Sequence, residues 1–560
     1  MRMATKGLML AIVLAVLVAG GLSSAWSQEV TFERLLNADK EANNWLSYFR
    51  DFRGWRYSPL KQVDTTNVKR LVPKWVFNTE GAGLQLTPIV ADGVMYLTNS
   101  NNDVFALNAA TGAILWRYQH DLPDAMPSRI WGRWNRGVSL IGNRVIVGTM
   151  DAQLIALDAR TGKPLWKVKA GDYTIGEGIT SPPIIVRDKA IVGVAPLEFG
   201  SRGFVAAYNI ATGEQVWRFY TVPAPGEPGH ETWGGESWKY GGAAPWIPGT
   251  YDPRLNLVFF GTGNPVPMFL HTDVRPGDNL YSDSLIALDA DTGKLRWYFQ
   301  HIPHDLWDLD SQAEPMLVDL EHGGRTVSAI IQAHKNGFLY AFDRENGRLL
   351  YAKPYVPRIT WARGLDNNGR PTPDVAPTAE GAVFCPSFLG AKNWNHAAYN
   401  PLTGYVYIPT SDVCSNIKTV ATEPKPGAPY VGGDLALVPE GAYGMVQAVD
   451  IKTGTTKWQH RLKYPLYASV LTTAGGLVFA GDPAGGFHAL DARSGKLLWQ
   501  YSTGPGHRAS SIAYSVAGKQ YIAVPSGWAG PAADLLPGVF PEAKSFPRGS
   551  AMIVFGLFEE

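Results

Sequence analysis

One eleven-residue pattern recurs along the chain and constrains its fold more than any other feature. Each copy is typical of a strand, then an Asp-x-x-Thr-Gly turn whose glycine can adopt a positive φ, then a second strand ending in a large aromatic residue. Such internal repetition predicts a repeat protein built from small antiparallel sheets. The seven copies are Ala106–Trp116, Ala156–Trp166, Ala207–Trp217, Ala287–Trp297, Ala341–Tyr351, Ala448–Trp458 and Ala489–Trp499.

The spacing of the terminal aromatics predicts how many units the chain contains. Successive aromatics are 50, 51, 80, 54, 107 and 41 residues apart. The interval of 107 residues is about two repeats long and contains the degenerate turn Tyr399–Gly404, which gives eight units. A closed ring protects sheet edges that an open array of roughly thirty strands would expose. We therefore predict an all-β, eight-bladed β-propeller with tryptophan-docking repeats, closed by the strand near Trp75 and the last strand, Ala551–Gly556.

The N-terminus has the features of a secretory signal peptide. A basic start precedes an unbroken run of apolar and small residues, Gly7–Gly21, and Ala25 and Ser27 suit the positions that signal peptidase recognises. An uncleaved membrane anchor is the alternative, but the run is short for a bilayer span. We predict a signal peptide over residues 1–27 and a single propeller domain over 28–560, with no stable membrane span in the mature, exported chain.

Charge and composition exclude several classes of protein. The chain has 50 Lys and Arg against 49 Asp and Glu, so it lacks the basic excess of a nucleic-acid binder. With 45% hydrophobic and only 18% charged residues, it is neither disordered nor a coiled coil. G-x-S-x-G, P-loop and HExxH motifs are absent, which leaves serine hydrolase, nucleotide-binding and zincin functions without support.

The chain has two cysteines, Cys385 and Cys414. An oxidising compartment permits one disulfide between them, and two free buried thiols are the alternative. Neither CxxC nor CxxCH occurs, so the chain has no motif for a zinc ribbon or a covalently attached c-type haem.

A run of acidic residues follows the polar, aromatic insertion in the 80-residue interval. Asp305, Asp308 and Asp310 lie within six residues, and their carboxylates repel one another unless a cation or solvent separates them. A solvated acidic loop is the alternative. His301 and His304 lack a third ligand at suitable spacing, so we interpret them as packing or loop residues.

Several short motifs resemble those of the quinoprotein alcohol dehydrogenases, periplasmic eight-bladed propellers that hold pyrroloquinoline quinone (PQQ) and a metal ion. The similarity extends over essentially the whole mature chain. The blade repeat by itself is weakly specific, because non-enzymatic outer-membrane assembly propellers share it. The motifs are Asn44-Trp-Leu-Ser-Tyr48, Arg56-Tyr-Ser-Pro-Leu60, Asn135-Arg-Gly137, Glu198-Phe-Gly-Ser-Arg-Gly203, Gly261-Thr-Gly-Asn264, Leu306-Trp-Asp308, Lys335-Asn-Gly337 and Gly390-Ala-Lys-Asn-Trp394.

The resemblance implies roles for individual residues. Glu198, Asn264 and Asp308 match the ligands of the active-site cation, and oxygen ligands suit a hard ion such as Ca²⁺. Asp308 also matches the catalytic base. Cys385 and Cys414 resemble a structural disulfide found in part of the family. The positions that match cofactor contacts are Arg136, Thr180, Trp246, Lys335 and Asn393.

Asp310 bears on the identity of the metal. In the lanthanide-using alcohol dehydrogenases, an aspartate two residues after the base adds a metal ligand, and an extra carboxylate suits a trivalent ion. Membrane-bound glucose dehydrogenases, which use divalent ions, carry a similar Leu-Trp-Asp-x-Asp run. The resemblance therefore leaves Ca²⁺ and a lanthanide ion both open.

The implied reaction is oxidation of an alcohol to an aldehyde or ketone. A cation polarises the quinone carbonyl, Asp308 takes the alcohol proton, and hydride moves to the quinone. Because the chain has no haem motif, electrons pass to a separate acceptor such as cytochrome c. The implied location is the periplasm, and a homodimer is compatible with the sequence.

Several positions depart from the family pattern around the cofactor. Each differs from the usual residue in size, charge or hydrogen-bonding capacity. The departures are Ile130 and Trp131 for adjacent cysteines, Gln85 for Glu, Ala244 for Thr, Tyr467 for Trp, and Pro196 and Leu197 in a turn of small residues, where proline has no N–H to donate. A larger alcohol, a polyol or a sugar therefore becomes an alternative substrate. A non-enzymatic scaffold is the third hypothesis, against which the retained Glu198, Asn264 and Asp308 argue.

Overall fold

The computed structural model describes residues 29–124, 126, 132–196 and 198–559. The predicted signal peptide and the departures at Ile130, Trp131 and Leu197 lie outside these residues.

The described residues form eight sheets of four or five strands and one two-stranded ribbon. The first five sheets are β3 (Ile89–Ala91), β4 (Val94–Thr98), β5 (Val104–Asn108) and β6 (Ile114–Tyr118); β7 (Ser139–Ile141), β8 (Arg144–Gly148), β9 (Gln153–Asp158) and β10 (Pro164–Lys169); β11 (Ile184–Val186), β12 (Lys189–Val194), β13 (Phe204–Asn209) and β14 (Gln215–Tyr220); β15 (Thr250–Asp252), β16 (Leu257–Gly261), β17 (Ser284–Asp289) and β18 (Leu295–Gln300); and β19 (Met316–His322), β20 (Arg325–Ala333), β21 (Phe338–Asp343) and β22 (Leu349–Pro354).

Two of the three remaining sheets incorporate an N-terminal strand, β1 or β2. They are β25 (Ala382–Phe384), β26 (Ala398–Asn400), β27 (Tyr405–Thr419), β28 (Gly433–Asp450) and β29 (Thr455–Leu462); β1 (Tyr57–Ser58), β30 (Leu471–Thr473), β31 (Leu477–Gly481), β32 (Gly486–Asp491) and β33 (Leu497–Ser502); and β2 (Leu71–Asn78), β34 (Ile512–Val516), β35 (Lys519–Ser526) and β36 (Ala551–Leu557). The ribbon is β23 (Ala362–Leu365) with β24 (Pro371–Pro373).

Among the described residues, helical structure is confined to short segments. The two α-helices are α1 (Phe32–Leu36) and α2 (Pro531–Leu535), and the 3₁₀ turns are η1 (Ala38–Lys40), η2 (Val68–Arg70), η3 (Tyr173–Ile175), η4 (His230–Thr232), η5 (Ser237–Tyr240), η6 (Leu536–Gly538) and η7 (Pro541–Ser545). In the described part of the chain, no helix combines the length and apolarity needed to cross a membrane.

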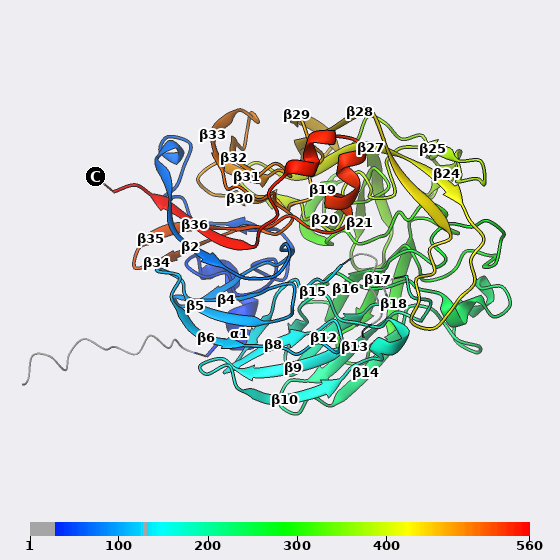
Figure 1. Cartoon of the computed structure of the whole chain (residues 1–560), viewed down its shortest axis with the longest axis horizontal. Helices are drawn as coiled ribbons and strands as arrows, with labels where there is room; N and C mark the ends of the chain where they lie inside the picture. The colour runs from blue at the N-terminus through cyan, green and yellow to red at the C-terminus, as the bar shows by residue number, and fades with distance from the viewer. Residues whose placement is uncertain (1–28, 125, 127–131, 197, 560) are drawn as a thin grey trace, which may run out of the picture.

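The sheets follow one another around a common centre in chain order, from blue through cyan, green and yellow to orange (Figure 1). The first strands of neighbouring sheets contact one another. For example, β7 contacts β11, and β30 contacts β34. Each sheet is mostly buried on its inner strands and more exposed on its fourth. The all-β prediction is confirmed.

The two ends of the chain meet in one sheet, which closes the ring. Strand β2 pairs antiparallel with β36, with Leu71 opposite Leu557 and Asn78 opposite Ala551. The red C-terminal strand therefore lies beside the blue N-terminal one (Figure 1). The predicted closing strands are confirmed.

The interval of 107 residues does not contain two repeats. It holds the β23–β24 ribbon and a single sheet whose central strands, β27 and β28, are 15 and 18 residues long. β26 pairs with one end of β27 and β25 with the other, and Tyr399–Gly404 forms the first hairpin of this sheet. The interpretation of that interval was wrong, because strand lengthening rather than a second sheet fills it. The eighth sheet is the closing one.

Six of the seven recurrent aromatics contact the turn of the following sheet in the described structure. Trp116 donates its indole N–H to the carbonyl of Ala159 at 2.8 Å, and its ring covers Gly162. A Cβ at Gly162 would lie 2.5 Å from that ring, and its φ of +71° independently favours glycine. The same contacts recur for Trp75 with Ala109, Trp166 with Ile210, Trp217 with Ala290, Trp297 with Arg344 and Trp458 with Ala492, while the Tyr351 hydroxyl donates to Ile451.

Strand direction divides the loops between two ends of the ring. In an antiparallel sheet the turns after the first and third strands lie at one end, and the loops after the second and fourth lie at the other. The Asp-x-x-Thr-Gly turns follow third strands and occupy the first end, the turn end. Longer and less regular loops occupy the opposite end.

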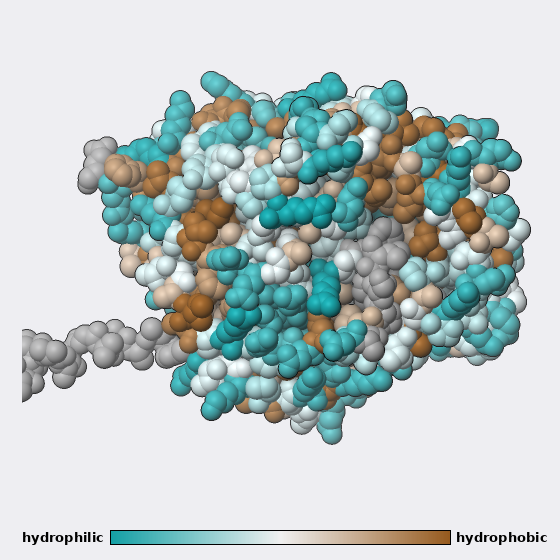
Figure 2. Space-filling model, in the orientation of Figure 1, coloured by the Kyte–Doolittle hydropathy of each residue, from teal (hydrophilic) through white to brown (hydrophobic). Residues whose placement is uncertain are grey.

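The face seen in Figure 2 is covered largely by hydrophilic residues, and hydrophobic residues form separate smaller patches among them.

Candidate active site

Every predicted metal- or cofactor-binding residue lies on a loop at the end opposite the Asp-x-x-Thr-Gly turns. The loops that precede first strands carry Arg136, Thr180, Trp246, Asp308, Asp310 and Asn393. The loops between second and third strands carry Glu198, Asn264 and Lys335. Residues spread over some 260 positions of sequence thus meet because alternating strand direction brings these two kinds of loop to the same end.

One cavity brings most of these residues together. It encloses an empty volume of about 730 Å³, part of which is open to solvent. Asn264 is not part of its wall. The lining residues are Gln85, Trp134, Arg136, Thr180, Glu198, Trp246, Asp308, Asp310, Lys335, Phe388, Leu389, Asn393, Trp394, Tyr467, Arg508, Pro531 and Ala532.

A buried lysine joins the two predicted carboxylates. Lys335 Nζ lies 3.3 Å from Asp308 Oδ1 and 2.9 Å from Asp310 Oδ2, and all three side chains are at least nine-tenths buried. Burial raises the pKa of Asp308 well above its ordinary value; the Lys335 ammonium opposes this shift, and the carboxylates of Asp310 and Glu198 add to it. The pKa of Lys335 is raised despite its burial, because the two carboxylates favour the charged form. Asp308 is therefore a carboxylate with increased affinity for a proton.

The remaining predicted metal ligands lie beside this group. The backbone N–H of Asn264 donates to Asp310 Oδ1 at 2.8 Å, and its side-chain Nδ2 donates to the carbonyl of Pro265 at 3.1 Å. Glu198 is half-buried on the cavity wall. In the described ranges, no three His, Cys, Asp or Glu side chains converge closely enough to hold an ion by themselves. A cation here would therefore need further oxygen ligands, such as the Asn264 amide.

Arg136 organises the opposite part of the wall. Its Nη1 donates to Thr180 Oγ1 at 2.7 Å, and its guanidinium carbon lies 4.9 Å from the centre of the Trp246 ring and 5.0 Å from that of Trp394. Burial lowers the pKa of Arg136 to about 9, which leaves it cationic at neutral pH. Asn393 donates through Nδ2 to the carbonyl of Leu389 and accepts from the backbone N–H of Trp394.

Several polar atoms around the cavity have no hydrogen-bond partner. Buried polar groups almost always find partners in folded proteins, so a cluster without them indicates a polar ligand. A planar molecule with carbonyl and carboxylate oxygens fits this set, because the cations and indole rings offer both hydrogen bonds and flat surfaces. Among the described residues that line the cavity, the atoms without partners are Gln85 Oε1, Arg136 Nε and Arg508 Nε.

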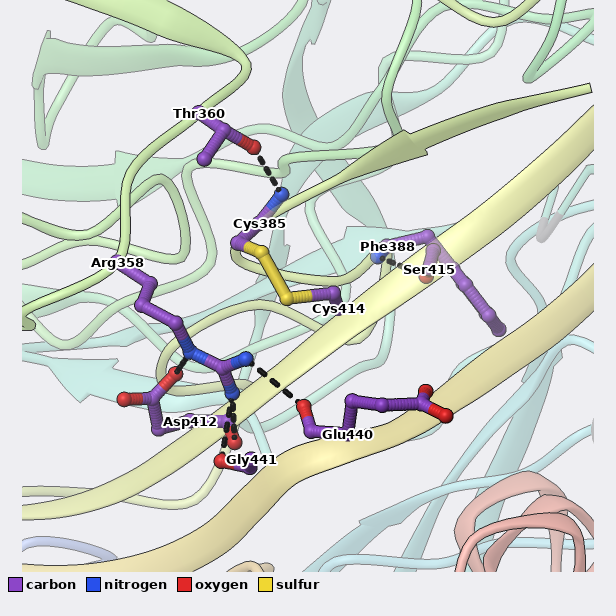
Figure 3. Close-up of a disulfide and its surroundings, with 9 residues drawn as sticks. All are labelled: Arg358, Thr360, Cys385, Phe388, Asp412, Cys414, Ser415, Glu440 and Gly441. Atoms are coloured by element: carbon purple, nitrogen blue, oxygen red, sulfur yellow. Dashed lines mark hydrogen bonds and ion pairs between the residues drawn. A yellow bond between two sulfur atoms is a disulfide. The ribbon is translucent and has the colours of Figure 1, made fainter.

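A disulfide supports one side of the cavity. Cys385 and Cys414 are bonded, which confirms the predicted pairing and joins the segment after β25 to β27 (Figure 3). The adjacent Ser415 accepts a hydrogen bond from the backbone N–H of Phe388 at 3.0 Å. The cross-link therefore holds Phe388, a cavity-lining side chain, against the long strand.

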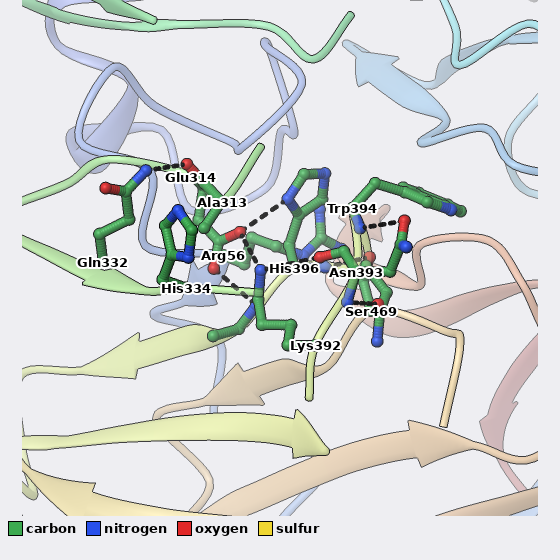
Figure 4. A network of polar contacts seen from close by, with 12 residues as sticks. Arg56, Ala313, Glu314, Gln332, His334, Lys392, Asn393, Trp394, His396 and Ser469 are labelled. Atoms are coloured by element: carbon green, nitrogen blue, oxygen red, sulfur yellow. Dashed lines mark hydrogen bonds and ion pairs between the residues drawn. The ribbon is translucent and has the colours of Figure 1, made fainter. Parts of the chain in front are cut away.

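A fully buried polar network supports the segment that carries Asn393 and Trp394 (Figure 4). Glu314 Oε2 accepts from Lys392 Nζ at 3.0 Å and lies 3.0 Å from His396 Nδ1. Glu314 Oε1 accepts from the backbone N–H of Ala397 at 2.7 Å. One carboxylate thus fixes both sides of the loop.

The histidines of the acidic run take structural positions. Ser311 Oγ lies 2.8 Å from both His301 Nδ1 and His334 Nε2, and the two imidazoles pack with their centres 4.3 Å apart. His304 Nδ1 lies 2.9 Å from the carbonyl of Gly277. These contacts agree with the interpretation of His301 and His304 as packing or loop residues.

Two departures from the family pattern, Gln85 and Tyr467, lie on the cavity wall. Ala244 lies behind it, where its carbonyl accepts from Gln312 Nε2 at 2.7 Å, and the carbonyl of Pro196 accepts from the backbone of Phe199. Sequence inspection did not single out Trp134, Phe388, Leu389, Arg508, Pro531 or Ala532 as site residues. No motif marks them; only the convergence of loops at this end of the ring could have found them.

Comparison with protein families identifies this architecture. A PQQ family model described as the glucose/ethanol/alcohol dehydrogenase beta-propeller domain matches residues 45–357. A second model, described as outer membrane protein assembly factor BamB, matches residues 409–526.

Individual relatives and solved structures match nearly the whole chain. The quinoprotein alcohol dehydrogenase PedH of Pseudomonas putida is 41% identical, over 97% of this chain and 95% of its own length. The lanthanide-dependent methanol dehydrogenase of Methylacidiphilum fumariolicum is 36% identical, over 92% of this chain and 89% of its own. A europium-containing methanol dehydrogenase structure superposes with a TM-score of 0.88 at 34% identity, covering 94% of this chain and all of the other. With its all-β propeller fold, this chain belongs to the family of PQQ-dependent quinoprotein alcohol dehydrogenases.

Proposed function

We propose that this protein oxidises a small-molecule alcohol to an aldehyde or ketone, with Asp308 as the catalytic base. The observation that carries the proposal is a buried Asp308 whose affinity for protons is raised, on the wall of a cavity with cations and unpartnered polar atoms. A base of this kind takes the hydroxyl proton more readily than an exposed aspartate would. Lys335 offsets the negative charge around it.

Arg136, Thr180, Trp246, Lys335 and Asn393 would hold the cofactor. The two cations suit carboxylate and carbonyl oxygens, and Trp246 offers a flat apolar surface. When bound, PQQ supplies the acceptor for the hydride of the alcohol carbon. The protein's own part is to position the alcohol, to exclude water and to remove its proton.

Glu198, Asn264, Asp308 and Asp310 are the proposed metal ligands. All four offer oxygen atoms, which suit Ca²⁺ or a lanthanide ion. Glu198, Asp308 and Asp310 supply three carboxylates, and Lys335 supplies one positive charge. The region is therefore negative overall, which favours a trivalent over a divalent ion. The similarity to a lanthanide-dependent methanol dehydrogenase supports the same choice.

The apolar side of the cavity favours an alcohol over a sugar. Phe388, Leu389, Pro531 and Ala532 present hydrocarbon rather than hydrogen-bonding groups. α2, which carries the last two, packs in the same hydrophobic cluster as Phe388 and Tyr467. A hydrocarbon chain on the substrate would be desolvated there.

The wider features of the proposal follow from the family and the fold. We propose a periplasmic protein, exported by residues 1–27, whose residues 28–560 form a single domain. Its eight sheets would be the eight blades of the propeller, docked through the recurrent tryptophans. Electrons would leave to a separate acceptor such as cytochrome c.

The test is a dye-linked assay on apoprotein reconstituted with PQQ and either Ca²⁺ or a light lanthanide. We expect activity toward primary or secondary alcohols that requires both additions, and a loss of about 10³-fold or more in kcat for Asp308→Asn. Asp434→Asn, at an exposed site on β28, is the matched control and should retain full activity. Preference for glucose or polyols would favour the sugar alternative. Absence of PQQ binding and of all activity would favour the scaffold.

A further inference from the structure

Arg508 is a buried cation on the cavity wall to which neither the motifs nor the family resemblance assigns a role. It lies on the loop between β33 and β34, and only 6% of its surface is exposed. Within the described part of the chain, its one hydrogen bond runs from Nη1 to the carbonyl of Ala529, and Nε has no partner. No carboxylate in the described part of the chain forms an ion pair with it, and Asp534 acts on it only at longer range. A buried arginine needs an anion or several acceptors, so with a single carbonyl this one keeps donors available for a ligand.

The side chain is held in place by tight packing. Its guanidinium carbon lies 5.1 Å from the centre of the Trp134 ring. Gly530 lies against both side chains, since a Cβ there would fall 2.6 Å from Arg508 Nη1 and 2.0 Å from Trp134. The guanidinium is therefore oriented before any ligand arrives, which reduces the entropy cost of binding.

A second buried arginine lies near enough to repel it. Arg508 helps to lower the pKa of Arg136, although burial is the main cause, and burial lowers the pKa of Arg508 itself to about 10. Both remain cationic at neutral pH, and both line the same cavity. An anion bound between them would offset their repulsion and the cost of burying each charge.

We propose that Arg508 binds a carboxylate inside the cavity, together with Arg136. The carboxylate belongs either to PQQ or to the tail of a substrate that is both an alcohol and an acid. The inference rests on the proposed function, because that function supplies both sources. It makes Arg508 a cofactor- or substrate-binding residue beyond the predicted set. The planar fork of Arg suits a carboxylate better than an ammonium group does.

The first arm of the test measures PQQ binding to apoprotein by quenching of tryptophan fluorescence, without any turnover. Arg508→Gln should raise the Kd for PQQ at least tenfold, and Arg508→Lys should raise it less. The trimethyl ester of PQQ, which lacks the carboxylates, should bind wild type and Arg508→Gln equally. Arg493→Gln, an exposed arginine in the turn before β33, is the matched control and should bind PQQ as wild type does.

The second arm compares 4-hydroxybutyrate with 1-butanol as substrates of the reconstituted enzyme. If Arg508→Gln leaves PQQ binding intact but raises KM at least tenfold for the hydroxy acid alone, the carboxylate belongs to the substrate. Unchanged values in both arms would overturn the proposal while leaving the proposed function standing. Failure of wild type to bind PQQ would overturn both. If Arg508→Gln does not fold, Arg508→Lys and the ester comparison on wild type decide the first arm.

Discussion

The two ends of the ring differ in how they satisfy their polar groups. At the turn end, Asp158 Oδ1 accepts hydrogen bonds from the backbone of Arg160 and from both the backbone and hydroxyl of Thr161, so each turn is self-contained. At the cavity end, Gln85 and Arg508 keep buried atoms without partners on the wall of one cavity, whereas the unpartnered atoms Arg144 Nε and Thr473 Oγ1 at the turn end lie in different sheets of the described chain. Left-handed non-glycine residues occur at both ends, as Asp308 and Glu198 at the cavity and Asp92 and Arg187 in hairpins at the turn end.

The contrast separates stability from chemistry. A turn that satisfies its own polar groups, and contacts only the aromatic residue of the preceding sheet, can be repeated around the ring. Buried cations without partners cost free energy, and such costs gather where a ligand is bound. The regular turns therefore belong to the scaffold, and the irregular loops belong to the site. The following experiments test that division, from the largest expected effect to the smallest.

Replacing a tryptophan with alanine should affect stability at the turn end and cofactor binding at the cavity end. Trp116→Ala removes the contacts with Ala159 and Gly162, and we expect it to lower the free energy of unfolding by about 3–5 kcal/mol with little change in kcat. Trp246→Ala, at a half-buried cavity site, should cost less stability but weaken PQQ binding about tenfold. Urea denaturation and fluorescence titration measure the two effects.

The exposed Leu115, next to Trp116 on β6, provides a control, and Leu115→Ala should change stability by less than about 0.5 kcal/mol. Equal loss of stability for the two tryptophan variants would contradict the division between the ends.

Acid should destabilise the protein through buried histidines near the site. Burial lowers the pKa of His396 to about 4, against an ordinary value of 6.5. Between these values the unfolded chain binds more protons than the folded one, so stability falls as pH decreases from 6.5 toward 4. For His396 alone the loss approaches about 3 kcal/mol.

His396→Gln should be less stable at neutral pH, since it loses the imidazole contacts with Glu314 and Tyr48, but its stability should depend less on pH. Urea denaturation at several pH values between 4 and 6.5 measures the slope. A slope identical to wild type would show that His396 does not contribute to the acid sensitivity.

Asp310 should distinguish trivalent from divalent ions. Asp310→Asn keeps the side-chain shape but removes one of three carboxylates, so lanthanide affinity should fall about tenfold or more and Ca²⁺ affinity should fall less. Calorimetric titration of PQQ-loaded protein with each ion measures both. A larger effect on Ca²⁺ would exclude Asp310 as the residue that favours a trivalent ion.

The repeat made the fold predictable because the spacing of its residues reflects the strands and turns of each sheet. The turn glycines, the alternating strands and the terminal aromatics each reflect contacts within one sheet or with the next. The 107-residue interval was misinterpreted, because β27 and β28 are longer than the other strands but show no change in local sequence pattern. Aromatic spacing counts sheets only while their strands keep a uniform length.

Most predicted site residues lie within motifs, whereas Thr180 and Trp246 were matched to the family outside any motif. Asp308, Lys335 and Arg136 lie within recognisable motifs and meet on one cavity wall. Arg508 lies on a loop without such a motif. Its burial depends on Trp134, which is far away in sequence, and on Gly530, which lies on another loop.

The sequence by itself determined the repeating sheet, the turn chemistry, the disulfide pair and the motifs of the family, because each depends on residues at fixed local spacing or on a recognisable resemblance. The tertiary structure decided which loops share a cavity, how Lys335 joins Asp308 to Asp310, and which buried cations lack partners. These properties depend on distances between loops of different sheets. Closure of the ring sets those distances, and no local pattern encodes them.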